Sequence, residues 1–126
     1  MEKMEKKKST HLETLKEMIE KKLEFSIIDL FSNLHAADIA ELIDNLDEED
    51  RLRLFSLLEV DKASEVILEL SDTSREQLIE DLSNEELTDI IEEMDSDDAA
   101  DIIAELSDDQ AKAVLDAIEP DDSEEV

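Results

Sequence analysis

The sequence predicts an all-α fold, namely a superhelical solenoid of short helices with a 12-residue repeat. Its first support is an apolar triplet at spacing i, i+1, i+4, which puts three side chains on one stripe of an α-helix. The triplet recurs every 12 residues without a gap, as Leu30/Phe31/Leu34, Leu42/Ile43/Leu46, Leu54/Phe55/Leu58, Val66/Ile67/Leu70, Leu78/Ile79/Leu82, Ile90/Ile91/Met94, Ile102/Ile103/Leu106 and Val114/Leu115/Ile118. Its second support is composition, because glycine is absent and proline occurs once, which argues against hairpins and glycine-rich loops.

Polar residues at a fixed phase between the triplets predict where each helix begins. Each predicted N-cap directly follows the last apolar residue of a unit, and these residues are Asp47, Ser71, Ser83, Asp95 and Ser107. Two of them have a glutamate or glutamine three residues later and fit a capping box, Ser83 with Glu86 and Ser107 with Gln110. The expected helices cover residues near 36–46, 48–58, 61–70, 72–82, 84–94, 96–106 and 108–118.

The repeat divides the chain into three segments. Residues 35–118 are expected to form the solenoid, because helices this short are stable only when neighbours hold them. Residues 1–34 are expected to form a helical segment leading into it, with one or two helices built around Leu12, Leu15, Ile19, Leu23 and Ile28, Leu30, Phe31. Residues 119–126 lack an apolar period and are expected to be an acidic linker toward further domains.

Charge and hydropathy exclude several classes of function. The net charge is −28, with seven lysines and five glutamates in residues 1–22 but five basic and 35 acidic groups in residues 23–126. Such a surface repels nucleic acid and attracts cations or basic partners. Apolar runs of two or three residues are far shorter than the roughly 20 residues that cross a bilayer, so direct membrane insertion is not expected.

No catalytic set can be assembled from the chain. Cysteine is absent, and His11 and His35 are the only imidazoles. His35 directly precedes an expected helix, where a solvated or capping histidine is the ordinary role. We therefore expect no enzyme activity.

The acidic residues are candidates for cation binding. Asp97 and Asp101 lie four residues apart on one expected helix, so their carboxylates share a face with no lysine or arginine nearby in sequence. Glu65 and Asp89 share the repeat phase of Asp101, from which a ridge of carboxylates is expected. A diffuse acidic face suits Mg²⁺, which keeps several waters and takes one or two carboxylates. The alternative from spacing alone is an ordinary solvated surface.

Three stretches of the sequence resemble a known family. They are 35–42 (HAADIAEL), 62–66 (KASEV) and 97–103 (DDAADII). In this order and at these distances they resemble the cytosolic N-terminal domain of MgtE magnesium transporters, over roughly residues 28–118.

The resemblance implies a regulatory domain at the cytoplasmic face of the cell membrane, in a transporter that is a homodimer. In such a transporter the domain is followed by CBS domains, a plug helix and a transmembrane pore for Mg²⁺. Mg²⁺ that bridges acidic residues of the N-terminal and CBS domains would then hold the pore closed. The family's ligands carry over to Glu65, Asp97 and Asp101, with Asp98 as a neighbouring candidate. Because this chain contains no CBS sequence, Mg²⁺ binding by the isolated domain is expected to be weak.

A rival prediction is a protein-interaction scaffold. Similar short-helix repeats occur in flagellar motor switch proteins and in adaptors that hold a partner on a concave face. A scaffold would respond to a basic or helical partner, whereas a sensor would distinguish Mg²⁺ from monovalent salt of equal ionic strength.

Overall fold

The computed structural model describes the backbone of residues 2–118 and the side chains of residues 11–118. Within that range the chain forms nine α-helices and no strand, which confirms the predicted all-α class. The helices are α1 (Glu2–Glu20), α2 (Glu24–Ser32), α3 (Ala36–Asp44), α4 (Glu48–Phe55), α5 (Val60–Glu69), α6 (Asp72–Asp81), α7 (Asn84–Glu92), α8 (Ser96–Glu105) and α9 (Asp108–Ile118). The predicted linker at 119–126 lies outside the described residues.

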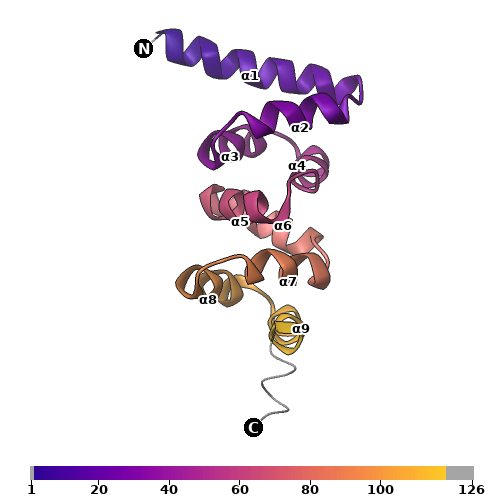
Figure 1. Ribbon diagram of the computed structural model, residues 1–126, viewed down its shortest axis with the longest axis vertical. Coiled ribbons are helices and arrows are strands. Elements are labelled where there is room, and N and C mark those ends of the chain that lie inside the picture. Colours follow the sequence, from indigo (N-terminus) through magenta and orange to yellow (C-terminus); the bar gives the residue numbers. More distant parts are fainter. Residues whose placement is uncertain (1, 119–126) are drawn as a thin grey trace.

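The helices stack along one long axis, with α1 at one end and α9 at the other (Figure 1). α1 and α2 pack on each other, and from α3 onward the most extensive contacts join helices two positions apart in sequence: α3 packs on α5, α5 on α7, α7 on α9, and α4 on α6. Two rows of helices therefore alternate along the chain, which is compatible with the predicted solenoid. Each 12-residue unit supplies one helix. Consecutive helices fall in different rows, so each row receives a helix from every second unit.

The apolar triplets build the core that joins these rows. Of their members in the described chain, Leu115 alone is exposed, at 44%, and the rest are buried or partly buried. Leu115 lies on α9, the last described helix, and no described helix follows to cover it. Leu23 and Ile28, two of the residues around which the N-terminal helices were expected to be built, are also exposed, at 43% and 41%. Both lie in the N-terminal part of the stack, and Val60 at the start of α5 is exposed as well.

The predicted N-caps are largely confirmed. The side chains of Asp47, Ser71, Ser83 and Ser107 each accept a hydrogen bond from the backbone N–H three residues later. At Ser83 and Ser107 the returning bond is also present, so both predicted capping boxes form. Asp95 occupies the N-cap position of α8 but its side chain makes no capping bond, so the predicted capping role of this residue is wrong.

Arg51 on α4 ties the two rows together. Its side chain is buried and donates to the carbonyl oxygens of Ile43 at 3.3 Å and Leu46 at 2.7 Å, at the C-terminal end of α3. It also donates to the side chain of Gln77 on α6. A guanidinium satisfies carbonyls that a helix C-terminus leaves without partners, and its charge complements the negative end of the helix dipole.

Arg75 on α6 has the same role as Arg51, two repeat units further along the chain. It donates to the carbonyl oxygen of Leu70, after the end of α5, at 3.0 Å, and Leu70 is the equivalent of Leu46. It also pairs with Glu105 on α8 at 2.9 Å. The hydrogen bond to Glu105 is the largest of the effects that raise the pKa of Arg75. The bonds of Arg75 thus join α5, α6 and α8.

Replacing Arg51 with alanine should lower the free energy of unfolding by about 2 to 3 kcal/mol, because buried carbonyl oxygens lose a charged donor. Urea unfolding followed by circular dichroism measures the change. The matched control is Arg53→Ala, since Arg53 is exposed on the same helix, and that change should stay within about 0.5 kcal/mol. Equal losses in the two variants would contradict the role given to Arg51.

The two neighbouring isoleucines of α8 should differ in the same measurement. Ile102 is 1% exposed, so Ile102→Ala should cost about 2 to 5 kcal/mol through lost burial and a cavity. Ile103 is only partly buried and its replacement should cost less than half as much. A larger loss at Ile103 would show that α8 turns the face with Ile103, and not the face with Ile102, toward the core.

Candidate metal centre

Three of the four predicted metal ligands lie at the beginning of α8. Asp97 and Asp98 are in its first turn and Asp101 is one turn later, so Asp97 and Asp101 share a face as the spacing predicted. Asp97 and Asp101 are exposed, whereas Asp98 is half-buried. None of the three accepts a hydrogen bond or ion pair from another described residue. Within the described part of the chain, their carboxylate oxygens have no partner and are available to a ligand.

Glu65, the fourth predicted ligand, lies elsewhere. It is an exposed residue of α5, in the row formed by α3, α5, α7 and α9, and Asp89 on α7 follows it in that row. Asp101 belongs to α8, which alternates with that row. The three residues therefore do not follow one row of helices, and the expected single ridge is not formed. Across the described residues, no three His, Asp or Glu side chains are grouped closely enough to hold a metal ion.

Asp95 adds a carboxylate that sequence reasoning assigned to a different role. Because its side chain does not cap α8, it is available beside the first turn of the helix, three residues before Asp98. Its place after the last apolar residue of a unit is the same as that of the residues that do form caps, so local sequence gave no signal that Asp95 is different. We name Asp95, Asp97, Asp98 and Asp101 together the α8 acidic corner.

The α8 acidic corner lacks the cation that its two predecessors have. Arg51 and Arg75 lie two repeat units apart, and the next equivalent position is Ala99, which is half-buried on α8. Arg51 and Arg75 bond to the carbonyls of Leu46 and Leu70, and the equivalent carbonyl here belongs to Met94, after α7. The end of α7 and the beginning of α8, with its aspartates, therefore follow one another without a guanidinium at the equivalent position. This signal was present in the sequence, as an arginine that occurs in alternate units and is then replaced by an alanine.

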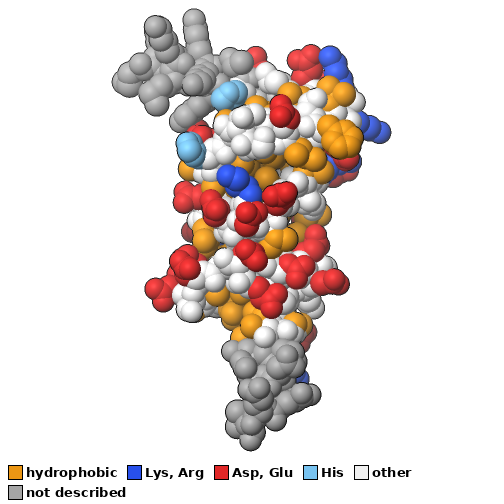
Figure 2. Space-filling model, in the orientation of Figure 1, with side chains coloured by type: hydrophobic (Ala, Val, Ile, Leu, Met, Phe, Trp, Pro, Cys, Tyr) orange, Lys and Arg blue, Asp and Glu red, His pale blue; other side chains and the backbone are white. Residues whose placement is uncertain are grey.

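The surface around this region is strongly negative. Figure 2 shows Asp and Glu side chains over much of the middle and lower areas of the visible face, while Lys and Arg gather near the upper right. Arg75 pairs with Asp72 and Glu105, so some of its charge is already neutralised within the fold. The net charge of the whole chain, −28, leaves this field without internal compensation and favours a bound cation.

The carboxylates of the α8 acidic corner could supply some, but not all, of the ligands of a hard divalent cation. Carboxylate oxygens are the ligands that Mg²⁺ uses, usually one or two together with waters and ligands from another partner. Asp97 and Asp101 supply such a pair on an exposed face. The residues present therefore fit one side of a Mg²⁺ site, and the remaining ligands would come from water or from a second surface.

These observations define an all-helical repeat domain with an uncompensated acidic corner, and comparison with known proteins gives its family. The family model of the MgtE intracellular N domain matches residues 34–126, and the chain belongs to that family. It is thus a domain of a magnesium-transporter family. No curated protein matches the chain. Among the described residues, no helix is both long and apolar enough to cross a membrane.

Placing a cation in the α8 acidic corner should stabilise the fold. Ala99→Arg puts a guanidinium at the position equivalent to Arg51 and Arg75, and should raise the free energy of unfolding by about 0.5 to 1 kcal/mol in metal-free buffer. Ala100→Arg is the control, since it adds the same charge at an exposed neighbouring position. If both variants gain equally, the effect comes from net charge and not from the corner.

Proposed function

We propose that this chain is the magnesium-sensing regulatory domain of a membrane Mg²⁺ transporter and not its conducting element. The observation that carries the proposal is the α8 acidic corner, where the arginine of two preceding corners is replaced by Ala99. A bound divalent cation would supply the missing positive charge. Membership of the MgtE intracellular N domain family supports magnesium as that cation.

The sensing site is shared between two surfaces. On this chain Asp97 and Asp101 contribute the exposed carboxylates, with Asp98 and Asp95 beside them. In the proposed transporter, CBS domains and the plug helix present the opposing ligands at the cytoplasmic face of the membrane, within a homodimer. A divided site of this kind binds Mg²⁺ weakly when one half is alone, because water must fill the remaining coordination positions.

Electrostatics then couples Mg²⁺ to gating. At low Mg²⁺ the strongly negative domain and an acidic partner surface repel each other, which favours separation. At high Mg²⁺ the ions bridge the two surfaces and stabilise the associated state, in which the pore is closed. Mg²⁺ shifts this equilibrium only by its preference for the associated state, so the carboxylates that bridge set the sensitivity.

Glu65 acts at a separate position in this proposal. Since it lies on α5 and not beside the α8 acidic corner, it would bind an ion of its own with ligands from the partner surface. Two separated half-sites on the same domain make closure depend more steeply on Mg²⁺ concentration than one site would.

The proposal is tested in the full transporter with Asp97→Ala combined with Asp101→Ala. Mg²⁺ flux into vesicles is measured at increasing Mg²⁺ on the cytosolic side. The concentration that closes half of the transporters should rise at least about tenfold in the variant, because bridging carboxylates are lost. The matched control is Glu76→Ala with Glu80→Ala, a pair of exposed acids also four residues apart, on α6. Unchanged closure in the aspartate variant, or the same change in both variants, would refute the assignment.

A further inference from the structure

A groove opens on the N-terminal half of the stack, away from the α8 acidic corner. It lies between α2 and the α4–α5 corner, and its volume is about 320 Å³. Apolar side chains of both segments line it, namely Ile28, Phe31, Leu57 and Leu58. Ile28 is 41% exposed although it is a large apolar residue. The fold thus leaves apolar surface open here that the core does not use.

Phe25 extends this apolar surface along α2. Its side chain is 90% exposed, more than any other large apolar residue in the described chain. Phe25, Ile28 and Ser32 follow the spacing i, i+3, i+7, so they share one stripe of α2. Because Ile28 and Ser32 line the groove, the same stripe carries Phe25 about one helical turn beyond its edge. The groove and Phe25 together span about two turns of α2.

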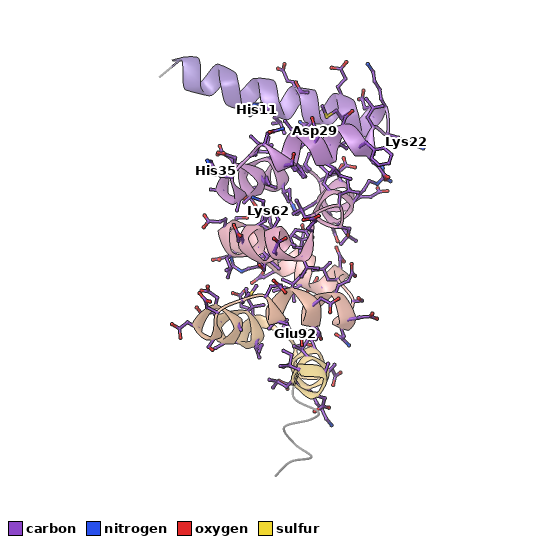
Figure 3. All side chains as sticks on the ribbon, viewed as in Figure 1. His11, Lys22, Asp29, His35, Lys62 and Glu92 are labelled. Carbon is purple, nitrogen blue, oxygen red and sulfur yellow. The ribbon has the colours of Figure 1, made fainter. Side chains whose placement is uncertain are left out.

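The rim of the groove is mainly acidic. Glu59, Asp61 and Glu65 line it from α5 and from the turn before α5, and Lys62 is the one basic lining residue. Lys62 projects near the middle of the stack in Figure 3. The Lys62 amine forms no ion pair within the described chain. An apolar floor with three carboxylates and one ammonium at the rim carries a net negative charge, so it complements a partner that is apolar and basic.

We propose that this groove binds an amphipathic helix whose apolar face packs on Phe25, Ile28 and Leu58 and whose basic residues pair with Glu59 and Asp61. A helix suits the groove because the floor is built from helix surfaces, and residues at i, i+3, i+4 and i+7 of a partner helix match a cleft of this kind. The inference goes beyond Mg²⁺ sensing. It needs no metal, and it gives this domain a second contact with its surroundings.

The choice of a basic helix over a second copy of this chain follows from charge. Another copy carries a net charge of −28 and would bring further carboxylates to an acidic rim. A basic helix instead relieves the repulsion among the rim carboxylates while covering Phe25. Desolvated apolar contacts at the centre with charge pairs at the rim are the usual composition of a specific interface.

The test uses this chain in metal-free buffer and a synthetic helical peptide of about four turns, with leucines at i, i+3, i+4 and i+7 and lysines elsewhere. One comparison peptide replaces the leucines with serine and keeps the charge. Amide NMR and isothermal titration calorimetry follow the binding. We expect saturable shifts at Ile28, Phe31, Leu57 and Leu58 with the leucine peptide, and at least about tenfold weaker binding of the serine peptide.

Two pairs of variants locate the binding on the protein. Phe25→Ser with Ile28→Ser should weaken the leucine peptide at least about tenfold, while Leu115→Ser, an exposed leucine at the other end of the stack, should not. Neutralising Glu59 and Asp61 with Gln and Asn should weaken it more than neutralising Glu80 and Asp81 on α6 in the same way.

The outcomes separate the possible occupants. Equal binding of the leucine and serine peptides would overturn the proposal, since it would mean attraction by net charge alone. Equal loss in the Leu115→Ser variant would overturn it as well. A dimer of the free chain that disappears in Phe25→Ser with Ile28→Ser would show that a second copy fills the groove. Because no Mg²⁺ is present, none of these results bears on the sensing role of Asp97 and Asp101.

Discussion

From α3 onward, the structure depends mainly on the packing of helices against helices two places away in the chain. Helices of eight to eleven residues make up the repeats, and such lengths are not stable alone in water. The apolar triplets of both rows pack into one core, which stabilises these short helices. The apolar residues of one unit are therefore buried only when its neighbours are in place. Arg51 and Arg75 add polar ties in the same geometry, because each connects the end of one helix to a later one. Stability is therefore shared along the stack.

The same geometry places the acidic residues along the stack. A strongly acidic surface is tolerable over most of the stack because acids occupy helix starts, where the dipole favours them. At the α8 acidic corner the compensating arginine is absent, and the carboxylates there have no described partner. A cation that completes the corner would act on a fold that the core already holds together. Binding would then change how the domain meets its surroundings without changing the helices themselves.

Local patterns predicted the helices well, and contacts between distant residues account for what they missed. The triplets and the caps at Asp47, Ser71, Ser83 and Ser107 depend on residues within about one helical turn. Such local patterns can be recognised from the sequence alone. The two-unit period of the rows, and with it the roles of Arg51 and Arg75, depends on carbonyls of other helices. The separation of Glu65 from Asp101 likewise follows from the packing of the rows, whereas the structure gives no cause for the missing capping bond of Asp95. The exposure of Ile28 accompanies the groove between α2 and the α4–α5 corner, which a repeat pattern does not mark.

The most direct test of Mg²⁺ sensing is an amide NMR titration of this chain with MgCl₂, compared with NaCl at matched ionic strength. We expect weak but saturable shifts that are specific to Mg²⁺ and centred on Asp97, Asp98 and Asp101, with a separate set at Glu65. Diffuse shifts that NaCl reproduces would contradict it, because they would mean that the acidic side chains of this domain only screen charge.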